Sequence, residues 1–113
     1  MRAYSGILLI DNDHRRNGSA TIDFARFHHH GQDVGDAQIR QPINVGGQKR
    51  FNGVPAYTAN IREWVADDKA RGGGESDDFI LNSFVNEDRL QIDWRLDDDH
   101  GGIHEISFIV IGE

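Results

Sequence analysis

The chain has 113 residues, enough for one domain with a single hydrophobic core, and its formal net charge is −7. A protein that neutralises phosphates needs a basic face, so this acidic balance argues against a nucleic-acid partner and against an anionic membrane surface. The sequence contains no cysteine, which excludes disulfides and thiol chemistry.

Composition points to strands and turns rather than helices. The hydrophobic fraction is 37%, and thirteen glycines accompany fourteen aspartates against only five glutamates. Aspartate favours turns and caps, whereas glutamate favours helix interiors. We therefore expect a loop-rich, all-β fold that forms one domain over residues 1–113. The apolar run near the N-terminus is too short for a signal peptide or a membrane span, so we expect a soluble chain, made in the cytoplasm, without membrane insertion.

The first half of the chain predicts three strands joined by polar turns. Ile7 to Ile10 reads as a buried strand that runs into an acidic loop. Asn17-Gly18 is a strong hairpin signal, and apolar and polar residues alternate from Ala20 to Phe24, so we expect the first two strands to pair as a hairpin. The third strand, Ile39 to Val45, contains Pro42, which lacks a backbone donor and confines the strand to a sheet edge.

Three segments in the middle of the chain are less regular. Phe27 to Gln38 is predicted to be a long loop, and the basic stretch Gln48 to Phe51 is predicted to be an exposed hairpin because glycines bracket it. Residues 57–71 fit two patterns. A period of two gives a strand, whereas a period of 3.6 gives one short helix near residues 60–71, with Asn60 opening a capping box. Both interpretations stay open.

The C-terminal third shows the clearest alternation. Strands are predicted at Phe79 to Val85, Arg89 to Leu96 and Ile103 to Gly112, joined by short polar turns into a β-meander. In the middle strand, the apolar residues, Trp94 among them, fall on one face and the polar residues on the other. The predicted fold is therefore an antiparallel β-sandwich with a C-terminal β-meander.

Two features of this pattern are candidate ligand-binding sites. Arg89, Asp93 and Arg95 form a polar stripe that can hydrogen-bond a glycan or a neighbouring subunit; an ordinary solvated sheet face is the alternative. Trp64 lies among charged residues, which makes it a candidate for stacking on a sugar or for a subunit contact. Burial on the inner side of a helix is its alternative.

The histidines suggest a transition-metal site. His28 and His30 would point to one side of an extended segment, and His100 and His104 flank the last turn. Imidazole pairs at such spacings bind zinc, copper or nickel, whereas solvent-exposed histidines are the simpler interpretation.

A calcium site is the second metal hypothesis. Asp97 and Asp99 are its candidate ligands, because Ca²⁺ prefers carboxylate oxygens. A solvated acidic turn is the alternative.

Catalytic motifs are weak in this sequence. It has no G-x-S-x-G nucleophile elbow, and one small core leaves little room for a deep pocket. We therefore expect a protein that binds rather than catalyses. A small metal-dependent enzyme that uses the histidines is the alternative.

The ending I-S-F-I-V-I-G, preceded by F-I-L-N-S-F, resembles the last strands of H-type lectins, and Tyr4-Ser5-Gly6-Ile7 resembles the start of that family. The resemblance implies a small β-sandwich that forms a homo-oligomer, typically a trimer, and recognises a glycan or another cell-surface ligand. Domains of this type also occur in bacteriophage tail and fibre proteins. The leading expectation is thus a lectin-like carbohydrate-binding module, and the alternative is a structural component of a virion, such as a phage capsid or tail, or of a similar assembly.

Overall fold

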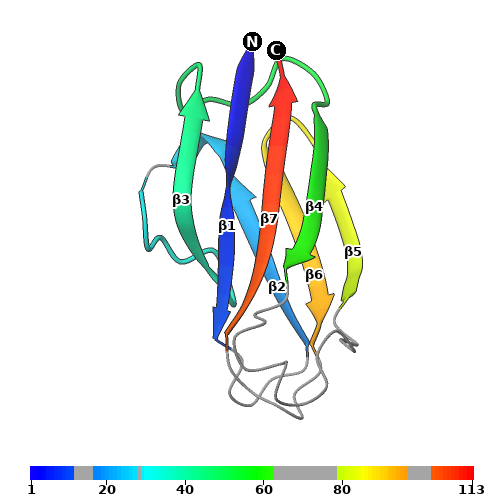
Figure 1. Ribbon diagram of the computed structural model, residues 1–113. Helices are drawn as coiled ribbons and strands as arrows, with labels where there is room; N and C mark the ends of the chain where they lie inside the picture. The colour runs from blue at the N-terminus through cyan, green and yellow to red at the C-terminus, as the bar shows by residue number, and fades with distance from the viewer. Residues whose placement is uncertain (12–16, 28, 63–78, 97–102) are drawn as a thin grey trace.

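A computed structural model describes residues 1–11, 17–27, 29–62, 79–96 and 103–113 (Figure 1). In these ranges the chain forms seven strands and one short 3-10 turn, which confirms the all-β prediction. The elements are β1 (Arg2–Asp11), β2 (Asn17–Asp23), η1 (Phe24–Arg26), β3 (Gln38–Val45), β4 (Ala56–Arg62), β5 (Phe79–Val85), β6 (Arg89–Arg95) and β7 (Ile103–Gly112). Since η1 is the only described helical element and has three residues, no described helix can cross a membrane.

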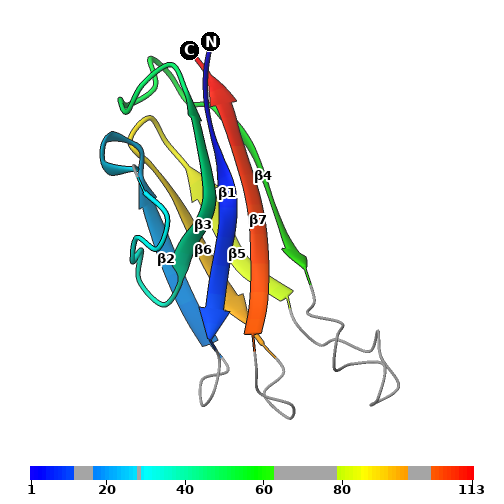
Figure 2. The same ribbon diagram turned by 60° about the vertical axis from the view of Figure 1, so that its left-hand side comes forward.

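The strands form two antiparallel sheets that pack face to face. Sheet A has the order β3-β1-β7-β4, and sheet B has the order β2-β6-β5. Figure 2 shows the two layers from the side, with both chain termini at one end of the sandwich. The predicted antiparallel sandwich is therefore confirmed.

The core lies between the sheets and is built by alternation along each strand. In β6, Leu90, Ile92 and Trp94 are buried while their neighbours face outward. From sheet A, β1 and β7 contribute further apolar side chains to the same cluster, including Leu8 and Phe108. Trp94 is 1% exposed, which agrees with its predicted core position.

The predicted hairpin between the first two strands is wrong. β1 pairs with β3 and β7 in sheet A, whereas β2 pairs with β6 in sheet B. Asn17 and Gly18 are the first residues of β2 and do not form a turn. Gly18 lies opposite Trp94, and a Cβ on this glycine would stand 2.7 Å from the indole ring. Glycine is needed here for space rather than for a turn conformation.

The predicted C-terminal meander is only half correct. β5 and β6 do form a hairpin, in which the Asn86 side chain accepts hydrogen bonds from the backbone N–H groups of Asp88 and Arg89. β7, however, pairs with β1 and β4 and not with β6. Every second residue of a strand faces the core, whether its partner lies beside it in the same sheet or across the core in the other sheet. The alternation in the sequence therefore did not show in which sheet β7 lies.

β3 and β4 are the two edges of sheet A. The prediction that the strand with Pro42 lies at an edge is confirmed, and Gln41 forms a bulge there with a φ of 51°. The strand interpretation of residues 56–62 is correct, and a helix that starts at residue 60 is wrong, because β7 pairs along this whole segment. The rest of the predicted helix, residues 63–71, lies outside the described residues.

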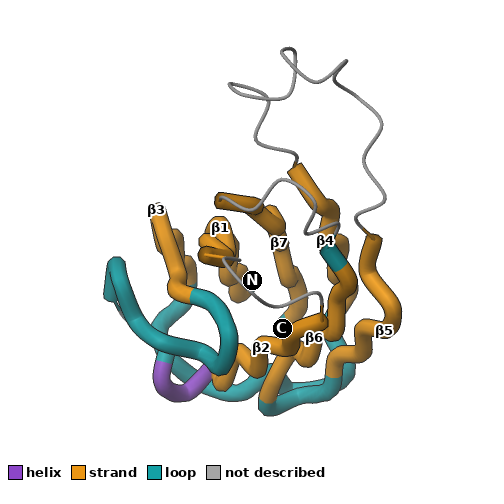
Figure 3. Tube along the Cα trace, turned by 90° about the horizontal axis from the view of Figure 1, so that it is seen from below, coloured by secondary structure: helices purple, strands orange, loops and turns teal. Residues whose placement is uncertain are grey.

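Contacts join sheet A to sheet B along both sides of the sandwich, where the edge strands of the two sheets lie (Figure 3). On one side, the predicted loop after Phe27 pairs with β2, where the Thr21 N–H donates to the Val34 carbonyl and the Asp36 N–H to the Ser19 carbonyl. On the other side, the hydroxyl groups of Tyr57 in β4 and Ser83 in β5 lie 2.7 Å apart and form a hydrogen bond. These contacts join the edges of the two sheets.

Residues 46–55 run from β3 to β4, across the end of the sandwich where the termini lie. The predicted hairpin at Gln48 to Phe51 is wrong because the flanking strands are at opposite edges of sheet A. Phe51 is buried and contacts the rings of Tyr4 and Phe24 edge-on. The Tyr4 hydroxyl accepts a hydrogen bond from the Lys49 N–H at 2.8 Å, which anchors the loop to the core.

Candidate functional site

The outer face of sheet B brings most of the predicted polar stripe together with residues from both neighbouring strands. The register places Thr21 of β2 and Phe84 of β5 on either side of Gln91. It places Ser19 and Asn82 on either side of Asp93 in the same way. We call this surface the polar face; its residues are Ser19, Thr21, Asn82, Phe84, Arg89, Gln91, Asp93 and Arg95.

Hydrogen bonds fix the side chains at the centre of the polar face. The Thr21 hydroxyl donates to Oε1 of Gln91, and Nε2 of Gln91 donates to Oδ1 of Asp93 at 3.1 Å. Both groups of the Gln91 amide are therefore oriented by protein neighbours. A row of polar groups held in fixed orientations loses less conformational entropy when it binds a ligand than a row of mobile side chains does.

The two predicted arginines lie toward the ends of this row. Arg89 is exposed opposite Asp23, and Arg95 is exposed opposite Asn17. Asp23 also forms an ion pair with Arg26 at 3.9 Å and accepts a hydrogen bond from the Ala25 N–H at 3.0 Å. The positive charges of the polar face therefore lie at its two ends, with Asp93 between them.

Two exposed apolar side chains, one on the polar face and one at its border, were not identified from the sequence. Phe84 is 43% exposed, and Leu81 is 52% exposed. The register of β5 against β6 shifts between Ile80 and Asn82, so Leu81 is the extra residue of a bulge. Simple alternation fails across a bulge, which is why the outward direction of Phe84 was not visible in the sequence.

The predicted metal ligands are only partly described. His30 is exposed on the loop after η1, and its Nε2 lies 2.9 Å from a guanidinium nitrogen of Arg40. His104 is 9% exposed and lies on the inner face of β7, opposite Ile10. The remaining candidates lie outside the described residues; they are His28, His100, Asp97 and Asp99. Within the described ranges, no group of three or more histidines and carboxylates is placed to hold a metal ion.

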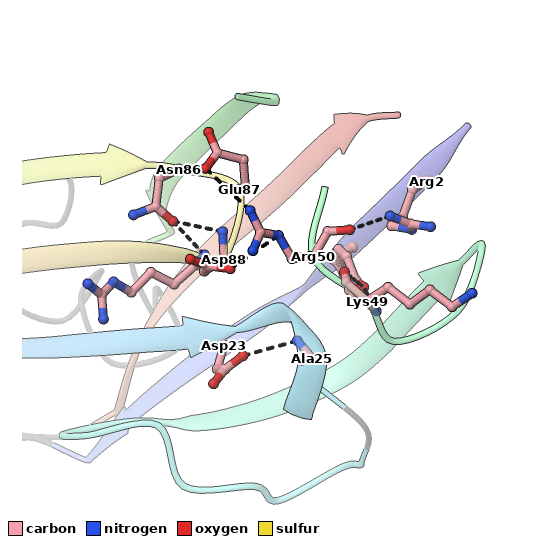
Figure 4. Close-up of polar contacts among 10 residues, drawn as sticks. Arg2, Asp23, Ala25, Lys49, Arg50, Asn86, Glu87 and Asp88 are labelled. Carbon is pink, nitrogen blue, oxygen red and sulfur yellow. Dashed lines mark hydrogen bonds and ion pairs between the residues drawn. The ribbon is translucent and has the colours of Figure 1, made fainter. Parts of the chain in front are cut away.

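Another polar cluster lies at the end of the sandwich near the termini and has a structural role (Figure 4). The Arg50 guanidinium lies 3.9 Å from the carboxylate of Glu87 and 3.7 Å from that of Asp88. Beside these ion pairs, the Phe51 N–H donates to the Glu87 carbonyl at 2.8 Å, and the Phe24 N–H donates to the Asp88 carbonyl at 3.0 Å. The cluster holds the β5–β6 turn against the neighbouring loops.

Fold and surface together define an antiparallel two-layer β-sandwich with a polar outer face on sheet B. No family model matches the chain, and comparisons with curated proteins and with solved structures give no significant match. The two outer faces of the sandwich are therefore the candidate binding surfaces. The predicted Trp64 site lies outside the described residues.

Proposed function

We propose that the protein is a non-enzymatic recognition module that binds carbohydrate on the polar face. One observation carries the proposal: an exposed aromatic side chain, Phe84, lies directly beside the oriented amide of Gln91. A pyranose ring has an apolar C–H face that packs on an aromatic ring and hydroxyl groups that pair with amides and carboxylates.

The shape of the surface favours an extended ligand. The polar face runs along three neighbouring strands, and its hydrogen-bonding groups recur at every second residue of β6. Several sugar units of one chain can then contact Gln91, Asp93 and Arg95 in succession. Exposed apolar surface is also costly in water, so covering Phe84 contributes to the affinity.

The test is a glycan array probed with the full chain, with and without calcium, followed by calorimetry on any ligand found. We expect the Phe84→Ala and Asp93→Ala variants each to weaken binding at least about tenfold, because they remove the stacking surface and a hydrogen-bonding group. Val54→Ala removes an exposed aliphatic side chain from the loop between β3 and β4 and is the matched control. An array without any bound glycan under either calcium condition would refute the proposal.

A second function is favoured by the opposite side of the sandwich. The outer face of sheet A exposes aliphatic side chains, including Ile43 and Ile109, as a contact between subunits would require. We therefore also propose a role as a structural subunit of a virion or a similar assembly. A chain that fails to bind any glycan but enters large particles together with other proteins would favour this second function over the first.

A further inference from the structure

The outer face of sheet A carries an apolar patch near the end where the termini lie. The strand registers place its residues in two rows that cross all four strands. We call this patch the apolar face; its rows are Val45, Ala3, Ile111 and Ala56, and Ile43, Ser5, Ile109 and Thr58. Neither row contains a charged residue, although the outer face of an antiparallel sandwich sheet is ordinarily polar.

The exposure of these side chains is high for large aliphatic residues. Ile43 is 60% exposed and Val45 is 46% exposed, while Ile109 and Ile111 are each 40% exposed. Contiguous apolar surface of this kind commonly marks a protein contact. On sheet B, by contrast, the outward residues of β6 are all polar or charged. The two outer faces of the same sandwich therefore differ in chemistry.

The apolar face has a ridge at one edge and a hollow at the other. Ile43 and Val45, the most exposed of the large aliphatic residues of the patch, lie on edge strand β3, and we call this pair the ridge. Near the opposite edge, β4 and β7 line a shallow hollow of about 130 Å³. The lining residues are Ala56, Tyr57, Thr58, Ile109 and Ile111.

These two features fit each other across a two-fold axis. If the axis runs parallel to the strands between β1 and β7, the β3 edge of one copy faces the β4 edge of the other, and each row faces itself. The ridge of each copy then enters the hollow of its partner, twice in one dimer. An axis across the strands, between the two rows, would instead place each β3 on the β3 of the partner, so that ridge meets ridge and hollow meets hollow.

The available area sets the strength of this contact. Four strands at a spacing of about 4.8 Å give a width of about 19 Å, and two rows of side chains extend about 14 Å along the strands. A flat contact of this size would bury about 500 Å² on the two copies together, well below the range of about 1,200–2,000 Å² for stable complexes. The expected dimer is therefore weak and reversible, and it depends on concentration.

Electrostatics favours the same surface. Each copy has a net charge of −7, so two copies repel each other, and they approach most easily where charge is absent. We propose that two copies of this chain form a reversible two-fold dimer through the apolar face, with the ridge of each in the hollow of the other. Added salt screens the repulsion between the copies and strengthens the dimer.

The first test is sedimentation velocity of the full chain over a range of concentrations. We expect the mass to rise with concentration from 12.7 kDa to twice that value. Ile43→Lys places a charge in each of the two hollows and should weaken the dimer at least about 100-fold. Leu81→Lys, an equal change at an exposed aliphatic residue of sheet B, should leave the dimer unchanged. A chain that stays monomeric up to about 1 mM, or that forms trimers, would overturn the proposal.

The second test uses the absence of native cysteine to check the orientation. The two-fold axis places Val45 of one copy opposite Ala56 of its partner, so the double variant Val45→Cys, Ala56→Cys should give a covalent dimer with oxidised glutathione. Val45→Cys alone should not, because the two copies of β3 lie at opposite edges of the interface, about 15 Å or more apart. Efficient cross-linking of the single variant would contradict the predicted orientation.

Discussion

Tyr4→Phe isolates the contribution of one hydroxyl group to the stability of the sandwich. The ring of Tyr4 is fully buried, stacks on Phe24 at 4.9 Å and meets Phe27 and Phe51 edge-on. Phenylalanine keeps these ring contacts. Any loss of stability in the variant therefore reports on the hydrogen bonds of the hydroxyl.

The hydroxyl is engaged on both its acceptor and its donor side. It accepts from the Lys49 N–H at 2.8 Å, and it lies 2.6 Å from the Lys49 carbonyl and 2.8 Å from the Gly47 carbonyl, to either of which it can donate. Removing the hydroxyl leaves a partly buried donor and acceptor without their partner. We expect the free energy of unfolding to fall by about 2 kcal/mol, which corresponds to a fall of about 8 °C in Tm for a domain of this size.

Urea denaturation of the variant and the parent measures this change, and hydrogen exchange at the Lys49 amide locates it. Tyr57→Phe is the control, because its hydroxyl makes one hydrogen bond, to Ser83, at the edge of the sandwich. Water can replace that partner more easily, so we expect a loss of about 1 kcal/mol or less. If Tyr4→Phe unfolds at the same urea concentration as the parent, the hydroxyl does not anchor the loop after β3.

Three further substitutions test other parts of the fold. Gly18→Ala forces a methyl group against the indole of Trp94, so thermal unfolding should show a loss of about 1–3 kcal/mol together with a changed Trp94 fluorescence. Gln41→Gly relieves a residue held at a φ of 51° and should raise the urea midpoint, by about 0.5 kcal/mol in free energy; a lower midpoint would mean that the bulge is not strained. Arg50→Ala removes two long ion pairs from a side chain that is 66% exposed, and its unfolding free energy should change by less than about 0.5 kcal/mol in low and in high salt.

Alternation along single strands predicted which residues face the core but not which strands are neighbours. The apolar face of β6 and the edge position of β3 follow from local chemistry, namely a period of two and the missing donor of Pro42. The pairings of β1 and β7 do not follow from it. A strand with one buried face shows the same alternation of apolar and polar residues whichever strands pair with it. The pattern therefore does not tell a neighbour in the same sheet from a strand across the core.

Local motifs misled where tertiary contacts decided the conformation. Asn17-Gly18 is compatible with a tight turn, yet Gly18 lies within a strand, where the indole of Trp94 leaves no space for a Cβ. In the candidate site, the stripe on β6 was predictable because the strand is regular. Phe84 was not, because the bulge in β5 changes the face on which the following residues lie.

The carbohydrate and dimer proposals use opposite faces of one sandwich, and together they make a prediction that neither makes alone. A two-fold dimer through the apolar face points its two polar faces in opposite directions, so one dimer can bridge two glycan-bearing particles but cannot bind one flat surface at both sites. Ile43→Lys should then leave the affinity for a single soluble oligosaccharide unchanged, as measured by calorimetry, while it abolishes the clumping of glycan-coated beads, as measured by light scattering. A loss of affinity in calorimetry would mean that Ile43 contributes to the sugar site itself, and unchanged clumping would mean that the dimer does not bridge particles.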